Sequence, residues 1–476
     1  MFARETYIER RKRLQRDIQS GLILFLGNDQ SPMNYPDNPY LFRQDSSFLY
    51  FFGLDSPGLA AVIDIDEQTE CVFGDDPTVD EIVWTGPQPT LRQKCERIGV
   101  NDTAPSHKLP DTLKAALQKS RDIHFLPQYR AENLFKIEKL LGIPANDVQQ
   151  HVSERLIKAV VAQRSIKSEE EIHEIEKALD IAYEMQTTAM KMAKPGVYER
   201  EIAGAMEGIA LARGGRLSFP TIFSIHGETL HNHYHGNVMK AGDIAVNDCG
   251  AETALGYASD ITRTIPVGGR FSRRQADIYS IVLDAQQKAI EAVAPGVEFR
   301  NVHRLACKIL TSGLKDLGLI KGDPDESVEA GAHTLFFQCG LGHMIGLDVH
   351  DMEALGEDYV GYTDAIKRNP AFGWRSLRLA KALESGYVIT VEPGIYFIPD
   401  LIDRWKAENK CSSFINYSAL EEYRDFGGIR IEDDILVTEA GGLARPTTGG
   451  RVLGKTIPRT IDQVEQASSP PVARQR

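Results

Sequence analysis

The sequence predicts an α/β protein of two domains, on three observations. The chain has 476 residues, more than one hydrophobic core usually supports. Short apolar runs alternate with helical patterns in the first third of the chain. Near residue 164 the pattern changes and a long amphipathic helix begins. We therefore predict an N-terminal domain over residues 1–160, a second domain over 161–456 and a mobile tail over 457–476.

The composition is typical of a soluble globular protein, with 42% hydrophobic and 25% charged residues. A formal net charge of −13 disfavours binding to nucleic acid or to an anionic membrane. No apolar stretch reaches bilayer length, and the N-terminus lacks the apolar core of a signal peptide. The six cysteines are scattered, without a CxxC pair. We expect free thiols and a cytoplasmic protein without nucleic-acid or membrane partners.

In the first domain, apolar runs at residues 22–26, 58–65 and 123–126 predict strands. A helical pattern covers residues 113–117, between the second and the third run. The chain therefore alternates strands with helical segments, as α/β domains do.

The second domain opens on a capping box, with Ser168 as N-cap and Glu171 three residues further on. Apolar residues at helical spacing follow, which predicts a long amphipathic helix. Further helices are expected at 274–293, where a Pro-Gly pair ends the pattern, and at 302–317. Strands are expected at 244–252, 257–267, 388–397 and 428–437. Residues 401–425 are long enough to form an insertion.

Four carboxylates stand where the strand patterns predict burial. They are Asp248, Asp260, Glu392 and Glu432. A buried carboxylate is costly unless it is paired or binds a cation. One such residue usually indicates only a strand end, but four of them favour a shared cation. With His343, which follows a Gly-Leu-Gly segment, they would suit a pair of divalent ions.

Two groups of histidines accompany these acids. Residues 226–235 hold four, including His231 and His233, and the residues alone do not decide between a polar loop and a catalytic cleft. His343 and His350 are seven residues apart, and the glycines before them favour a loop that approaches a site. The HExxH, GxSxG and P-loop motifs are absent, which disfavours a single-zinc peptidase, a serine hydrolase and a nucleotide-binding protein.

Five segments in order resemble the pita-bread metallopeptidases, the family of aminopeptidase P, prolidase and methionine aminopeptidase. They are DCGAE (248–252), GYASDITRT (256–264), GLGHMIGLDVHD (340–351), TVEPGIY (390–396) and GIRIEDD (428–434). FRQDSSFLYFFG (42–53) is similar to the N-terminal domain of aminopeptidase P. The resemblance implies an N-terminal α/β creatinase-like domain followed by a C-terminal pita-bread catalytic domain.

The resemblance also assigns roles. Asp248 would bind one metal ion, Asp260 and Glu432 would bridge two, and His343 with Glu392 would complete the other. The family generally uses manganese, with cobalt, zinc or iron as alternatives. The implied catalytic residues are His350, Glu392, Arg430 and His231, with His233 as the competing choice for the last. Cys339 departs from the family, which commonly has histidine four residues before the metal-binding histidine.

The implied activity is release of the first residue from peptides with proline in second position, by a hydroxide that bridges two metal ions. The family often forms homodimers or homotetramers. The nearest alternative is a prolidase, which cleaves Xaa-Pro dipeptides. An inactive pita-bread binding protein is disfavoured because all five ligand positions are retained.

Overall fold

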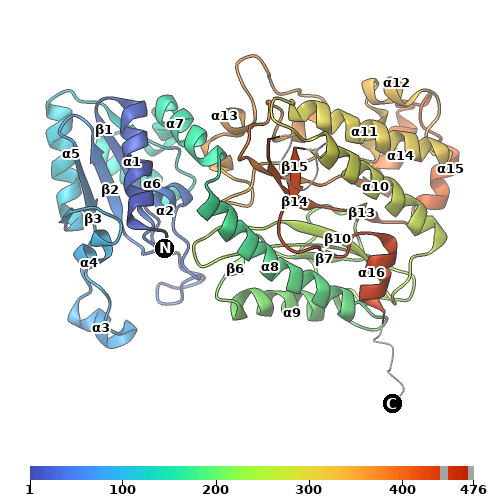
Figure 1. Cartoon of the computed structure of the whole chain (residues 1–476), viewed down its shortest axis with the longest axis horizontal. Coiled ribbons are helices and arrows are strands. Elements are labelled where there is room, and N and C mark those ends of the chain that lie inside the picture. The colour runs from blue at the N-terminus through green and yellow to red at the C-terminus, as the bar shows by residue number, and fades with distance from the viewer. Residues whose placement is uncertain (440–448, 470–476) are drawn as a thin grey trace. The chain divides into compact units, whose positions relative to one another are not determined.

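Figure 1 shows a computed structural model of the chain, which describes residues 1–439 and 449–469. The chain divides into two units. The first comprises Met1–Arg164 with Met352–Tyr359, and the second comprises Ser165–Asp351 with Val360–Arg476. The predicted boundary at residues 160/161 falls inside helix α7 (Glu154–Ser165). Across both described ranges, no helix has the length and apolar character that spanning a membrane requires.

The first unit is built on a five-stranded sheet with the order β4-β3-β2-β1-β5. Strand β1 lies antiparallel to β2 and parallel to β5. The strands are β1 (Leu22–Leu26), β2 (Ala60–Asp64), β3 (Thr69–Phe73), β4 (Asp102–Ala104) and β5 (Ile123–Phe125). The three predicted strands are confirmed as β1, β2 and β5.

Helices cover this sheet because their apolar faces complete its core. Leu24 and Phe125 from the sheet, Leu113 from α5 and Ile137 from α6 belong to one buried cluster. The predicted helical segment at 113–117 lies within α5, so this expectation is confirmed. The helices are α1 (Arg4–Ile18), α2 (Ser46–Phe52), α3 (Val79–Thr85), α4 (Leu91–Glu96), α5 (Leu109–Gln118) and α6 (Ala131–Leu141).

Two helix pairs frame the second unit. Helix α8 (Glu169–Met192) packs on α9 (Glu199–Ala212), and α10 (Arg273–Ala292) packs on α11 (Phe299–Asp316). The capping box predicted at Ser168 and Glu171 is present, with both reciprocal hydrogen bonds. The turns inside the two pairs have the same Pro-Gly-Val sequence, and both Gly196 and Gly296 have a left-handed φ (+89° and +83°).

Short strands lie between and against these helices. Strand β8 is the middle strand of an antiparallel sheet with the order β10-β8-β7, and β14 is the middle strand of β11-β14-β15. Strands β12 and β13 form one ribbon, and β6 and β9 form another. The strands are β6 (Arg216–Leu217), β7 (Ile222–Ser224), β8 (Ile244–Cys249), β9 (Ala251–Glu252), β10 (Ile261–Pro266), β11 (Val388–Val391), β12 (Gly394–Tyr396), β13 (Gly428–Arg430), β14 (Asp433–Val437) and β15 (Gly450–Val452).

Three of the four expected strands are shorter or broken where the acids lie. Glu392 separates β11 from β12, Glu432 separates β13 from β14, and Asp260 directly precedes β10. Only Asp248 lies inside a strand. The break at Glu392 has a direct cause, because Pro393 has no backbone N–H to donate to a ladder. Placing these three acids within continuous strands was therefore wrong.

Five further helices belong to the described residues of the chain. They comprise α12 (Pro324–Glu329), α13 (Glu357–Gly361), α14 (Pro399–Ala407), α15 (Tyr417–Leu420) and α16 (Ile461–Ser468). The predicted mobile tail is wrong for residues 457–469, because α16 has a Thr460–Gln463 capping box and buries Val464. The rest of that tail, 470–476, lies outside the described residues. All six cysteines are free thiols, as expected.

Candidate metal and catalytic site

All nine residues predicted for the site line one cavity of about 190 Å³ in the second unit. They are His231, His233, Asp248, Asp260, His343, His350, Glu392, Arg430 and Glu432. The other lining residues are Cys339 and five apolar ones, Phe219, Pro220, Ile222, Leu230 and Val349. The cavity lining therefore combines charged residues with apolar ones.

Neighbouring strands bring the first two acids together. Asp248 belongs to the middle strand β8, where it pairs with Thr262 of β10 on one side and with Ile222 of β7 on the other. Asp260 lies where the chain enters β10, and its backbone N–H donates to Asp434 Oδ2 at 3.2 Å. Both side chains are buried, and Oδ1 of Asp248 and Oδ1 of Asp260 each lack a hydrogen-bond partner among residues 1–439 and 449–469.

Glu432 and Glu392 reach the cavity from the strand breaks. Thr262 Oγ1 donates to Glu432 Oε2 at 2.6 Å, and Thr390 Oγ1 donates to Glu392 Oε1 at 3.3 Å. Since each threonine hydroxyl fixes one oxygen, the orientation of both carboxylates is set by the neighbouring strands. Sequence reasoning did not single out these threonines. Their place in the DITRT and TVEP motifs, next to predicted ligands, was the available signal.

His343 completes the cluster from a glycine-rich loop. Its Nδ1 lies 3.0 Å from the carbonyl oxygen of Met344, which can only accept, so Nδ1 carries the proton of the neutral ring. The other nitrogen, Nε2, lies 3.5 Å from Asp260 Oδ2 and 3.5 Å from Glu392 Oε1. Ligand atoms of Asp260, His343 and Glu432 lie within 4.8 Å of one another. This tautomer is the one that a histidine bound to metal through Nε2 requires.

Burial, together with the repulsion between the acids, raises the pKa values of three carboxylates in this cluster. Burial, and then the charge of Asp248, raises the pKa of Asp260 well above its usual value. Burial, and then the charge of Asp260, does the same to the pKa of Glu432. The pKa of Glu392 is raised as well, chiefly by burial. Carboxylates in this position bind protons or cations to offset their charge.

Arg430 supplies part of the positive charge that offsets the carboxylates. Its guanidinium donates to Asp248 Oδ2 at 2.5 Å, to the Tyr396 hydroxyl at 2.8 Å and to Thr262 Oγ1 at 3.1 Å. One guanidinium does not balance four carboxylates. The two acceptor oxygens without partners, the oxygen-rich ligand set and the single imidazole nitrogen therefore fit a site for divalent cations.

Three further residues that the sequence analysis singled out, His350, His231 and Cys339, also line the cavity. The ring of His350 meets that of His343 edge-on, with 4.4 Å between centroids. Burial lowers the pKa of His231, and the charges of Arg430 and His350 lower it further against the opposing effect of Asp248. Burial, and then Glu392, raises the pKa of the Cys339 thiol to about 12, so the thiol lines the cavity uncharged at neutral pH.

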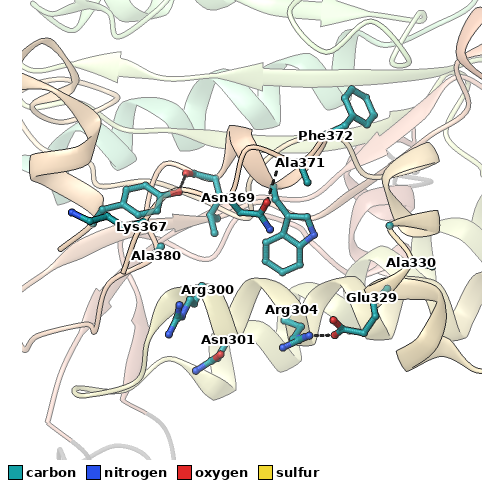
Figure 2. A pocket seen from close by; sticks show the side chains of 15 residues that line it. Arg300, Asn301, Arg304, Glu329, Ala330, Lys367, Asn369, Ala371, Phe372 and Ala380 are labelled. Carbon is teal, nitrogen blue, oxygen red and sulfur yellow. Dashed lines mark hydrogen bonds and ion pairs between the residues drawn. The ribbon is translucent and has the colours of Figure 1, made fainter. Parts of the chain in front are cut away.

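A larger cavity, of about 590 Å³, lies elsewhere in the second unit (Figure 2). Arg300, Asn301 and Arg304 of α11 line it, and Asn369 and Phe372 lie across from this helix in the figure. Trp374 is also among the lining residues. Its lining, all of it within the described residues, includes none of the predicted site residues. Size alone would have selected this cavity, whereas the carboxylate cluster selects the smaller one.

The fold and the cation site define a metallopeptidase. The model of metallopeptidase family M24 matches residues 173–439, more than half of the chain, and the chain belongs to this family. The model of the aminopeptidase P N-terminal domain matches residues 7–124.

Particular relatives agree with this assignment. The chain is 31% identical to human Xaa-Pro dipeptidase, over 94% of this chain and 89% of that protein. It is 32% identical to a probable Xaa-Pro aminopeptidase of Fusarium vanettenii, over 85% of each protein. Among solved structures, zinc-substituted aminopeptidase P of Escherichia coli in complex with product matches with a TM-score of 0.79 and 29% identity, over 98% of both chains. Aminopeptidase of Pseudomonas aeruginosa matches with the same TM-score and coverage at 25% identity.

Proposed function

We propose that this metallopeptidase releases the N-terminal residue from peptides that have proline in second position, using two divalent metal ions. The observation that carries the proposal is the cluster of four carboxylates and one histidine around a single arginine. Such a cluster is stable at neutral pH only with added positive charge. Relatives over most of the chain are named Xaa-Pro aminopeptidases and Xaa-Pro dipeptidases, which supports the substrate class.

The ligand assignment is the one that the family resemblance implies, and all five residues line the cavity. Asp260 and Glu432 would be shared between two ions, Asp248 would bind one ion, and His343 and Glu392 would bind the other. The oxygen-rich ligand set suits manganese. When bound, the ions would supply a nucleophilic water near neutral pH and polarise the substrate carbonyl.

The remaining residues act on the peptide itself. His350 lies against His343, where its ring can donate a hydrogen bond to the carbonyl oxygen of the first residue as negative charge develops there. His231 lines the same cavity and is placed to bind the substrate near the same bond. Glu392 would take a proton from the attacking water and deliver it to the proline nitrogen.

Proline explains why a dedicated enzyme is needed. Its nitrogen bears no hydrogen, so peptidases that bind this backbone donor handle the bond poorly. The apolar wall of the cavity, with Phe219, Pro220 and Val349, is suited to a compact apolar group. We propose that this wall contributes to proline selectivity.

A second candidate function is that of a dipeptidase that accepts only Xaa-Pro dipeptides. It is supported by the match to a Xaa-Pro dipeptidase over 94% of the chain. The deciding experiment compares a Xaa-Pro dipeptide with a Xaa-Pro-Xaa tripeptide, after chelation and re-addition of manganese. Manganese-dependent release of the first residue from the tripeptide supports the proposal. Cleavage of the dipeptide alone identifies a dipeptidase.

Two outcomes would contradict the proposal. One is no cleavage of either peptide by protein that demonstrably holds metal. The other is an Asp260→Ala variant with near-normal turnover, which would exclude a mechanism that needs both ions. Sedimentation velocity on the same preparation tests the expected homodimer or homotetramer.

A further inference from the structure

A buried ion pair lies at the end of the loop that runs from His343 to Asp351. Lys167 Nζ contacts Asp351 Oδ2 at 2.8 Å, and each side chain is only 1% exposed. Lys167 immediately precedes Ser168, the N-cap of α8, and Asp351 immediately follows His350. The pair therefore connects the start of a long helix to the residue next to a predicted catalytic histidine.

The loop between His343 and Asp351 is folded around this pair. The Asp351 N–H donates to the Met344 carbonyl at 2.9 Å, so the two ends of the loop meet. A side chain at Gly346 would place its Cβ 2.6 Å from Asp351 Oδ2 and 3.0 Å from Lys167 Cε. The loop thus approaches the ion pair so closely that any larger residue at position 346 would have to displace these two side chains.

A second contact links the same helix start to the metal site. The Tyr257 hydroxyl donates to Glu171 Oε1 at 2.9 Å, in a buried position. The next residue, Ala258, donates its N–H to the Gly346 carbonyl at 2.8 Å. The first turn of α8 therefore contacts both the loop with His343 and His350 and the segment that leads to Asp260.

Stability does not account for a buried pair of this kind. Desolvating two charges offsets most of their attraction, and apolar pairs of similar volume are often equally stable or more stable. The ion pair does supply a directional bond of fixed length, which an apolar pair does not. Such a bond has a use at this point of the chain. Asp351 is the last residue of its segment in the second unit, which the chain re-enters only at Val360, so the end of the loop benefits from being fixed.

We propose that Lys167 and Asp351 are positioning residues, which hold the His350 ring in its place within the catalytic cavity. The kinetic part of this inference rests on the proposed function. Lys167 and Asp351 act through His350 and do not line the cavity. A displacement of about 1 Å in such a group lowers turnover by about 100-fold.

The test uses the double variant Lys167→Met/Asp351→Leu, which removes both charges of the ion pair together. Thermal unfolding, manganese affinity by calorimetry, and kcat and KM are measured on the full chain. We expect unfolding temperature, KM and metal affinity close to those of the wild type, with kcat about 100-fold lower. Lys288→Met/Asp284→Leu, which removes an exposed pair in the same unit, is the matched control and should retain normal kcat.

A second readout needs no activity. The ring nitrogens of His350 are observed by NMR in chelated, histidine-labelled protein, with His350→Gln used to assign the signals. The proposal predicts that the double variant shifts these signals, whereas the Lys288/Asp284 control leaves them in place. Unchanged signals, or a double variant with wild-type kcat, would overturn it. If the wild type cleaves neither test peptide, the proposed function fails while the NMR result still decides the positioning role.

Discussion

Arg430 donates hydrogen bonds to Asp248, Tyr396 and Thr262, and it lies in a cluster where burial, and then repulsion between the acids, raises the pKa of Asp260. It was recognised from the GIRIED motif, but its bonds could not be predicted. Arg430 and Asp248 are 182 residues apart, and sequence spacing carries no information about such a contact.

Replacing Arg430 tests this charge balance. Arg430→Gln should destabilise the chelated protein by about 3–5 kcal/mol, because it leaves buried acids without their cationic partner. Metal ions would restore much of the balance, so the loss should be smaller with manganese bound. Calorimetric unfolding with and without manganese measures both values. Arg424→Gln, at a solvent-screened pair with Asp403, is the control and should leave the free energy of unfolding close to that of the wild type. Equal losses for Arg430→Gln in both metal states would contradict this account.

The choice between His231 and His233 also belongs to single residues. His231 is within electrostatic reach of Asp248, Arg430 and His350. We therefore expect His231→Asn to lower kcat by roughly 10²–10⁴-fold, the range for a group that acts on the reacting bond. His233→Asn should lower kcat by less than about tenfold. Steady-state kinetics on both variants decides the matter, and the reverse order would assign the role to His233.

At the scale of helices and strands, a feature was predictable from the sequence when the residues that determine it lie close together along the chain. The capping box at Ser168 and Glu171 was predictable because both partners lie within one turn. The break at Glu392 was hidden within an apolar run, although Pro393 was a local clue to it. Two Pro-Gly-Val turns, each between paired helices, were a repeat signal that the sequence reading missed.

One prediction at this scale concerns how the glycine-rich loop meets β11. A Cβ at Gly342 would lie 2.0 Å from the Thr390 carbonyl oxygen, so Gly342→Ala has to displace backbone beside His343. We expect a loss of about 1–3 kcal/mol in stability and weaker manganese binding. Gly204→Ala, in α9 with open space around it, should instead stabilise by about 0.5–1 kcal/mol. Urea unfolding and calorimetric titration measure both effects, and normal metal affinity in Gly342→Ala would contradict the argument.

At the scale of the whole molecule, sequence patterns predicted an α/β protein and its first strands. They did not predict which distant segments lie together in the fold. That expectation came from the resemblance of five ordered motifs to a known family. The helix over Ile461–Ser468 was missed because it is short and its stabilising contacts come from burial of Val464 rather than from a long repeating pattern.

Acid stability is a property of the whole fold. Burial lowers the pKa of His303 to about 3 and that of His333 to about 4, from an ordinary value of 6.5. Below pH 6.5 the unfolded chain binds these two protons and the folded chain does not, so stability falls with falling pH. Between pH 7.5 and 5.5 the free energy of unfolding should fall by about 1 kcal/mol less in His303→Phe than in the wild type. Urea unfolding of chelated protein at both pH values measures this, and identical losses would contradict it.

The separation of the site residues along the chain also has a consequence for synthesis. Asp248 leaves the ribosome 182 residues before Arg430, the guanidinium that partners it. At about 5–20 residues per second, this interval lasts roughly 10–40 seconds. For all of that time the nascent chain carries Asp248 without Arg430 and Glu432, and for most of it Glu392 is missing as well. The full set of candidate ligands therefore exists only after Glu432 has been synthesised, and ion binding that needs all of them would have to follow that step.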